Sequence, residues 1–90
     1  MPKYSVFLHK KALKQLEELQ QDETKSEIKN AIESLIDYPL SLRQMDVQKL
    51  EGFERAFRIR VGRFRVFFSV DKASRSVYVT KIEKRESAYE

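Results

Sequence analysis

The stretch FRIRVGRFRVFFSV, residues 57–70, has the pattern of two strands joined by a tight turn. Apolar and polar side chains alternate on both sides of a central Gly62 and Arg63, and this period of two is typical of a sheet with one buried face. Glycine at the first central position suits a two-residue type II′ turn. We therefore predict strands over residues 56–61 and 64–71. The side chains predicted to face the core are Phe57, Ile59, Val61, Phe64, Val66, Phe68 and Val70.

The opposite face of this hairpin carries arginines. Counting outward from a two-residue turn places Arg60 opposite Arg65, and Arg58 opposite Phe67. Directly opposed Cβ atoms in a sheet lie about 5 Å apart, and like charges there are destabilising. One interpretation is that the cluster binds an anion. The alternative is neutralisation by nearby acids, with Glu51, Glu54 and Glu83 as the candidates.

The rest of the chain supplies two helices and further extended segments. Residues 4–8 and 76–84 are predicted strands, and 47–52 is a short extended piece. Helices are predicted over residues 10–21 and from about residue 24 to just before Pro39, both with an apolar stripe at helical spacing. The predicted order is β-α-α-β-β-β in one domain over residues 1–90. This is an α+β fold, an antiparallel sheet with two antiparallel helices packed on one face.

Two arrangements are open for the last strand. With a simple four-residue turn before it, the arginine face receives Thr80 and Ile82. With one bulged residue, it receives Lys81, Glu83 and Arg85 instead. The second arrangement, which we favour, leaves to the core Tyr78, Thr80 and Ile82.

Charge and composition narrow the function. The net charge is +4, and every arginine lies within residues 43–90. Arginine suits bidentate contacts with phosphate, so an anionic partner is indicated, either nucleic acid or an acidic protein segment. The chain has no cysteine and one histidine, which argues against thiolate chemistry and the common zinc frameworks. We expect no metal and no cofactor. His9, at the junction of strand and helix, is expected to have a surface or helix-start role.

The N-terminal segment has only a short apolar run, too short for a signal peptide or a membrane span. The expected location is therefore the cytoplasm, with no membrane partner.

The order of elements and the segments KLEG, FRIRVGRFRVFFSV and KRESAY resemble the RelE/ParE superfamily of toxins, above all the RelE-type toxins of archaeal toxin–antitoxin modules. The resemblance covers nearly the whole chain. It implies a RelE-like fold and a ribosome-dependent endonuclease that cuts mRNA in the A site. It also implies three partners, namely the ribosome, mRNA and an acidic RelB-like antitoxin that holds the toxin inactive.

The resemblance also implies roles for single residues. Arg58 and Arg60 fall where bacterial relatives have two catalytic lysines, and Arg65 falls on the arginine that contacts the scissile phosphate. Arg85 falls on the essential arginine at the end of the last strand. Tyr89 resembles the C-terminal catalytic tyrosine, although it follows the arginine more closely than in the bacterial form. The residues predicted to bind RNA are Lys49, Leu50, Arg63, Phe67, Lys81 and Lys84.

Cleavage by attack of a 2′-OH on the neighbouring phosphate has three requirements. The nucleotide must be held in line, the negative charge that develops on the phosphate must be stabilised, and protons must be transferred. Fixed arginines can do the first two. They cannot act as a general base, because an arginine pKa of about 12.5 or above keeps the group protonated. The base is therefore supplied by the ribosome and RNA, or by one of Glu51, Glu54, Glu83 and Lys84. Tyr89 could stack on a base, donate a proton, or pack the tail on the sheet.

Two other functions stay open at this point. The chain could be a ParE-like inhibitor of DNA gyrase, a binding protein without catalytic residues. It could also be a nucleic-acid-binding module, such as a co-repressor acting with its antitoxin. A shared fold cannot separate these activities.

Overall fold

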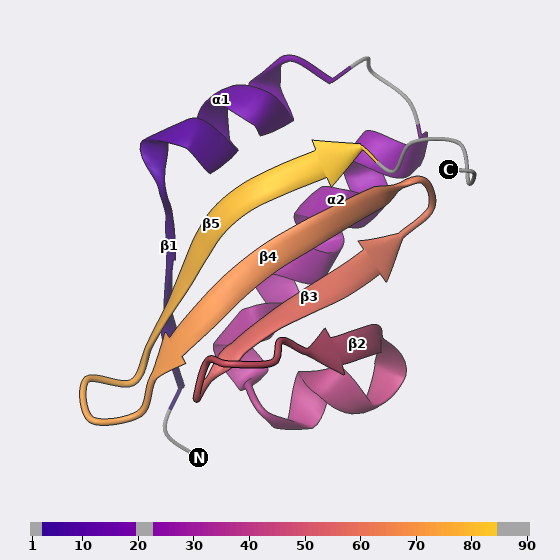
Figure 1. The fold of residues 1–90 in the computed structure, drawn as a ribbon. Helices are drawn as coiled ribbons and strands as arrows, with labels where there is room; N and C mark the ends of the chain where they lie inside the picture. The colour runs from indigo at the N-terminus through magenta and orange to yellow at the C-terminus, as the bar shows by residue number, and fades with distance from the viewer. Residues whose placement is uncertain (1–2, 20–22, 85–90) are drawn as a thin grey trace.

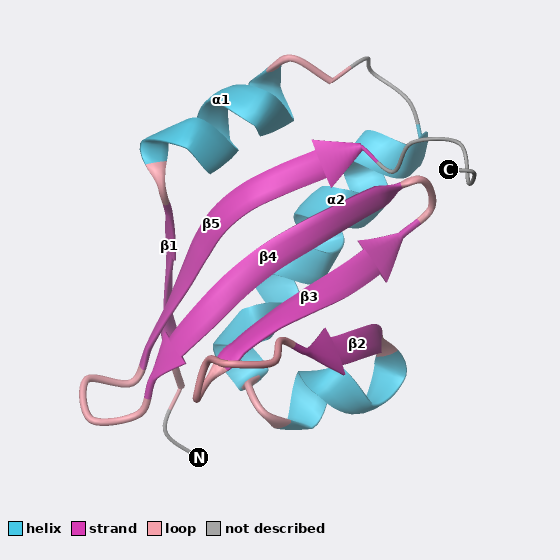
Figure 2. Cartoon of the chain, viewed as in Figure 1, coloured by secondary structure: helices cyan, strands magenta, loops and turns pink. Residues whose placement is uncertain are grey.

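The structure, a computed structural model, describes residues 3–19 and 23–84. These residues form five strands, two α-helices and two short 3₁₀ helices (Figures 1 and 2). In chain order these are β1 (Ser5–Leu8), α1 (Lys10–Glu17), α2 (Glu23–Ser34), η1 (Leu35–Asp37), η2 (Leu40–Gln44), β2 (Asp46–Lys49), β3 (Ala56–Val61), β4 (Phe64–Asp71) and β5 (Ser76–Lys84). The predicted bounds of the last three strands are confirmed, whereas α1 ends at Glu17, ahead of its predicted end.

The strands form one sheet in the order β1-β5-β4-β3-β2. The β1–β5 pair is parallel and the other pairs are antiparallel. The α+β class is confirmed. The extended piece expected near residues 47–52 is a true edge strand, β2, because its backbone pairs with β3. No helix in the described ranges is long and apolar enough to cross a membrane.

The hairpin has the predicted register. Arg60 pairs with Arg65 and Arg58 pairs with Phe67. Gly62 has a φ of 57°, in the left-handed region, and Arg63 does not. A positive φ at the first central residue alone is the signature of a type II′ turn. The turn therefore fixes which side chains meet across β3 and β4.

The core lies on one face of the sheet, and both helices contribute to it. In Figure 1 α2 lies behind the sheet and α1 lies beside β5. The buried apolar side chains are Ala12, Ile28, Ile32, Leu35, Ile59, Val66, Phe68, Val70, Val77, Val79 and Ile82. Of the predicted core residues, Phe57, Val61 and Phe64 are half-buried and pack against this set. Beyond the end of β1, Gln15 Oε1 accepts a 2.7 Å hydrogen bond from the backbone N–H of Ile82, and so closes the open edge of β5.

The bulge of β5 lies inside the strand, and this corrects part of the sequence analysis. The register of β4 against β5 shifts between Phe67 and Phe68, which leaves Thr80 as the extra residue. Ile82 is buried as predicted, but Tyr78 and Thr80 are exposed on the opposite face. The reason is that alternation reverses at Thr80 itself and not in the turn before the strand. Lys81 and Glu83 share the arginine face, as predicted.

His9 caps the first helix, as expected. Its Nδ1 accepts a 3.1 Å hydrogen bond from the backbone N–H of Lys11, which satisfies one free donor of the first turn of α1. This capping role accounts for the only histidine of the chain, and no catalytic function is needed to explain it.

Candidate nucleic-acid interface

The face of the sheet opposite α2 carries the predicted site. The strand registers arrange its side chains in three rows across the sheet. The first row contains Phe7, Tyr78, Ser69 and Ala56; the second contains Lys81, Phe67, Arg58 and Gln48; the third contains Glu83, Arg65, Arg60 and Asp46. Neighbouring rows lie about 7 Å apart, because they are two residues apart along β3 and β4; on β5 the bulge at Thr80 adds one residue between the first and second rows. We call this surface the free face.

The edge strand β2 supplies one partner to each arginine of β3. Arg58 Nη2 donates to Gln48 Oε1, and Arg60 Nε lies 3.5 Å from Asp46 Oδ2. These pairs follow from the register, which sets Gln48 opposite Arg58 and Asp46 opposite Arg60. The two guanidinium groups are thereby oriented toward one margin of the sheet.

Gln48 and Asp46 were missed from the sequence. Their signal was the alternation in the segment DVQK, where Val47 faces the core and its two polar neighbours face the other way.

Arg65 occupies the middle of the third row. It lies on β4, between Arg60 on β3 and Glu83 on β5. The nearby carboxylates are engaged elsewhere, since Asp46 pairs with Arg60 and Glu83 Oε2 lies 2.9 Å from Lys81 Nζ. Within residues 3–19 and 23–84, Arg65 makes no ion pair or side-chain hydrogen bond. Its half-buried guanidinium is therefore the cation of this face best placed to receive an added anion.

Phe67 and Lys81 form the second row beside Arg58. The ammonium of Lys81 lies 4.7 Å from the centroid of the Phe67 ring, a cation–π contact. This contact and the ion pair with Glu83 hold Lys81 over the face. Among the acids considered as a general base, Glu83 is the one on this face, whereas Glu51 and Glu54 lie in the connection between β2 and β3.

Neutralisation of the arginine cluster by acids is partly realised, and anion binding stays a prediction. The described free face carries four cations and two carboxylates, so neutralisation is incomplete. Asp46, which was not among the predicted acids, supplies half of it. An exposed surface with excess positive charge and an aromatic ring fits the backbone and bases of a single-stranded nucleic acid.

The remaining predicted residues lie away from this cluster. Lys49 pairs opposite Phe57 on the core side of the sheet, and Lys84 pairs opposite Phe64 on that same side. Arg63 is exposed at the hairpin turn, where it and Lys84 line a hollow of about 610 Å³. Leu50 extends the β2–β3 ladder through a 2.8 Å hydrogen bond from its N–H to the Ala56 carbonyl. Their RNA-binding roles stay predictions. Arg85 and Tyr89 lie outside the described residues.

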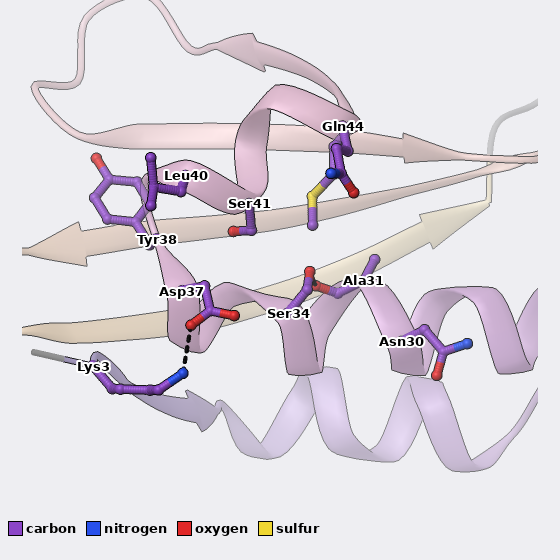
Figure 3. Close-up of a pocket in the computed structure, with 10 residues that line it drawn as sticks. Lys3, Asn30, Ala31, Ser34, Asp37, Tyr38, Leu40, Ser41 and Gln44 are labelled. Carbon is purple, nitrogen blue, oxygen red and sulfur yellow. Dashed lines mark hydrogen bonds and ion pairs between the residues drawn. The ribbon is translucent and has the colours of Figure 1, made fainter. Parts of the chain in front are cut away.

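A hollow of about 680 Å³ lies between α2 and η2, and its lining residues differ from those of the free face (Figure 3). Lys3 Nζ and Asp37 Oδ1 form an ion pair of 2.7 Å at its rim. Tyr38 and Ser41 also line it, and no arginine does. Burial raises the pKa of the Tyr38 phenol, and nearby Tyr4 adds to this rise. A phenol that stays neutral and a paired lysine do not form a phosphate site, so the free face remains the candidate interface.

Comparison with known proteins agrees with this geometry. A family model for the ParE toxin of the type II toxin–antitoxin system parDE matches residues 6–89. The chain belongs to this toxin family. A candidate toxin named RelE1 from Methanocaldococcus jannaschii is 36% identical over 87 residues, which cover 97% of this chain and 96% of that protein. The resemblance to the RelE/ParE superfamily is therefore confirmed.

Solved structures share the fold of this toxin. The archaeal RelE–RelB complex from Pyrococcus horikoshii matches with a TM-score of 0.81 and 29% identity, over 98% of this chain and 100% of that one. The isolated RelE toxin of E. coli matches with a TM-score of 0.78 and 20% identity, over 94% and 87% of the two chains. At this lower identity the second match speaks for the fold alone.

Proposed function

We propose that this toxin is a ribosome-dependent endonuclease that cleaves mRNA in the A site and so inhibits translation. One observation carries the proposal. Arg65 lies directly opposite Arg60 on a sheet face that no described helix covers, and the carboxylates near it are paired with other cations. A cluster of like charges that destabilises the free sheet is understandable if it binds a phosphate. The similarity to RelE-type toxins supports the same activity.

In the proposed reaction the 2′-oxygen of one nucleotide attacks the adjacent phosphorus, and the bond from phosphorus to the 5′-oxygen breaks. The products are a 2′,3′-cyclic phosphate and a 5′-hydroxyl. Arg65 holds the non-bridging oxygens as their charge grows, and Arg60 adds a second fixed cation across the strand pair. Preorganised donors of this kind account for a large part of catalysis in many enzymes. Arg58, held by Gln48, positions the next phosphate along the RNA.

Proton transfer is assigned to β5. Glu83 is the acid opposite Arg65 and takes the proton of the 2′-OH. The ammonium of Lys81, which pairs with Glu83 at 2.9 Å, gives a proton to the leaving 5′-oxygen. Glu83→Gln keeps the shape of the side chain but removes both the base and the negative charge. Slower cleavage with RNA binding unchanged or tighter would therefore indicate the role as base, because loss of a neutralising charge alone would not slow the reaction.

The proposed protein partner is an acidic, partly helical RelB-like antitoxin in the cytoplasm. The excess of cations on the free face complements a negative segment that folds as it binds. The solved relatives include toxins in complex with RelB, which supports a partner of this kind. Binding that covers the free face would inhibit the toxin by excluding RNA.

The test is to incubate the purified toxin with ribosomes that hold a defined codon in the A site, and to map new mRNA 5′ ends by primer extension. We expect cleavage inside the A-site codon, and none of the same message without ribosomes. DNA gyrase supercoiling is assayed in parallel, because the matching family model is that of the ParE toxin. Inhibition of gyrase without any mRNA cleavage would establish the ParE-like function instead.

A further inference from the structure

Two aromatic rings stand exposed at one end of the free face. The rings of Phe7 on β1 and Tyr78 on β5 are stacked, with centroids 5.6 Å apart and planes 20° apart. Phe7 is 50% exposed and Tyr78 is 41% exposed. Neither ring joins the core, and the position of Tyr78 follows from the bulge at Thr80. Two large rings left in water call for a partner with apolar or planar surface.

One side of Tyr78 is free to receive a planar group. Phe7 covers the side toward β1, whereas the neighbour on β4 is Ser69 and the next residue across the sheet is Ala56, both small. Ser69 and Ala56 also line a hollow of about 420 Å³, which Tyr78 does not line. The exposed ring of Phe53 and two pairs of neighbours of opposite charge complete its lining, namely Glu54, Arg55, Asp71 and Lys72. The row thus consists of two stacked rings followed by two small side chains, which do not cover the side of Tyr78 turned away from Phe7.

The adjacent row supplies positive charge at the spacing of a strand repeat. Arg58 lies two residues along β3 from Ala56, which is about 7 Å, and Lys81 lies three residues along β5 from Tyr78, because the bulged Thr80 stands between them. Phe67 lies between them and carries the ammonium of Lys81 on its ring. Sites for single-stranded nucleic acids usually combine aromatic rings that stack on the bases with nearby cations that bind the phosphates.

We propose that Tyr78, supported by Phe7, is a stacking site for one nucleobase of single-stranded RNA, next to the arginines of the free face. The proposal rests on the proposed function for its ligand, RNA, but assigns a subsite that the reaction itself does not use. The charge of the adjacent row favours RNA over an apolar protein segment. A base stacked here fixes the register of the strand, so that a neighbouring phosphate lies over Arg58 and the next over Arg65.

The experiment measures binding of a fluorescein-labelled single-stranded oligoribonucleotide to the full-length toxin by anisotropy, at several salt concentrations and without ribosomes. Tyr78→Ala is expected to weaken binding by about 5- to 150-fold, the range found for loss of one stacked base. The slope of log affinity against log salt stays unchanged, because no phosphate contact is lost. Tyr78→Phe keeps the ring and binds within about twofold of the unaltered chain.

Four comparisons make the result decisive. Tyr78→Leu retains apolar bulk without a flat ring. It should lose RNA affinity while keeping the fold, so it serves as the test if Tyr78→Ala destabilises the protein. Leu13→Ala removes a side chain of similar exposure, 45%, from α1 and should bind normally. An abasic oligomer should bind the unaltered chain and Tyr78→Ala equally. Arg58→Ala, by contrast, should reduce the salt slope by about 0.7.

Several outcomes would overturn the proposal. They are unchanged RNA affinity in Tyr78→Ala and Tyr78→Leu, equal loss in Leu13→Ala, or loss of antitoxin affinity with RNA affinity intact. The last result would make the rings a protein-docking surface. The proposed function fails separately. If ring-dependent RNA binding is found but programmed ribosomes are never cut, the stacking site stands and the nuclease activity does not.

Discussion

Replacing Arg65 by alanine should separate activity from stability in this toxin. The structure sets the expected size of both effects. Arg65 faces Arg60 on one side and Glu83 on the other, so its removal relieves one repulsion and loses one attraction. At about 6 Å in water each such interaction is worth about 0.7 kcal/mol, and the two largely cancel. Unfolding free energy should therefore change by no more than about 0.5 kcal/mol, or less than about 4 °C in Tm.

Activity should fall much further. Loss of one preorganised donor to a developing oxyanion costs about 100- to 1000-fold in rate. The assay is the single-turnover rate of mRNA cleavage on A-site-programmed ribosomes, with a thermal melt of each variant. Arg65→Lys should recover part of the rate, because lysine keeps the charge but not the bidentate fork.

Arg43→Ala is the matched control, since it removes an exposed arginine of η2, outside the sheet. Its rate should equal that of the unaltered toxin. Cleavage at the normal rate by Arg65→Ala would refute the reasoning and leave the arginine cluster as a docking surface. A fall in Tm of more than about 8 °C would show that Arg65 supports the fold.

Four further outcomes are expected. Ile32→Asp places an unpaired charge in the core, where Ile32 is 4% exposed, and should unfold the domain by circular dichroism. Gly62→Ala should cost about 1 kcal/mol in urea unfolding, from the positive φ alone, because an added Cβ meets no atom closer than 3.6 Å. Burial raises the pKa of Tyr38, so this residue leaves the unfolding free energy unaffected below about pH 10 and lowers it as the pH rises further. Tyr38→Phe should flatten that decline. An equal decline in the variant would contradict the assignment to Tyr38. Antitoxin affinity, measured by calorimetry, should weaken as salt rises, and indifference to salt would count against an acidic partner.

The hairpin was predictable because its local chemistry is self-consistent. Alternation fixed the buried face of β3 and β4, and Gly62 fixed the turn type and hence the pairing of Arg60 with Arg65. These rules act within a few residues, so one sequence suffices to apply them. The same holds for the cap at His9.

The wrong or missed predictions concern features that depend on how one strand pairs with another. The position of the bulge at Thr80 depends on how β5 fits against β4, and no residue near Thr80 marks it in the sequence. For this reason Tyr78 was assigned to the core and its exposed stack with Phe7 was not foreseen. The partners of Arg58 and Arg60 on β2 were missed for a related reason, because an edge strand of four residues is a weak signal on its own.

The central claim is that the free face promotes attack of a 2′-OH on a phosphate of ribosome-bound mRNA. The most direct measurement compares two messages on A-site-programmed ribosomes, one with ribose throughout and one with a single 2′-deoxynucleotide at the cleaved position. We expect rapid cleavage of the first message, with a 2′,3′-cyclic phosphate at the new 3′ end, and an intact second message. Equal cleavage of both messages, or cleavage of neither while gyrase is inhibited, would contradict it.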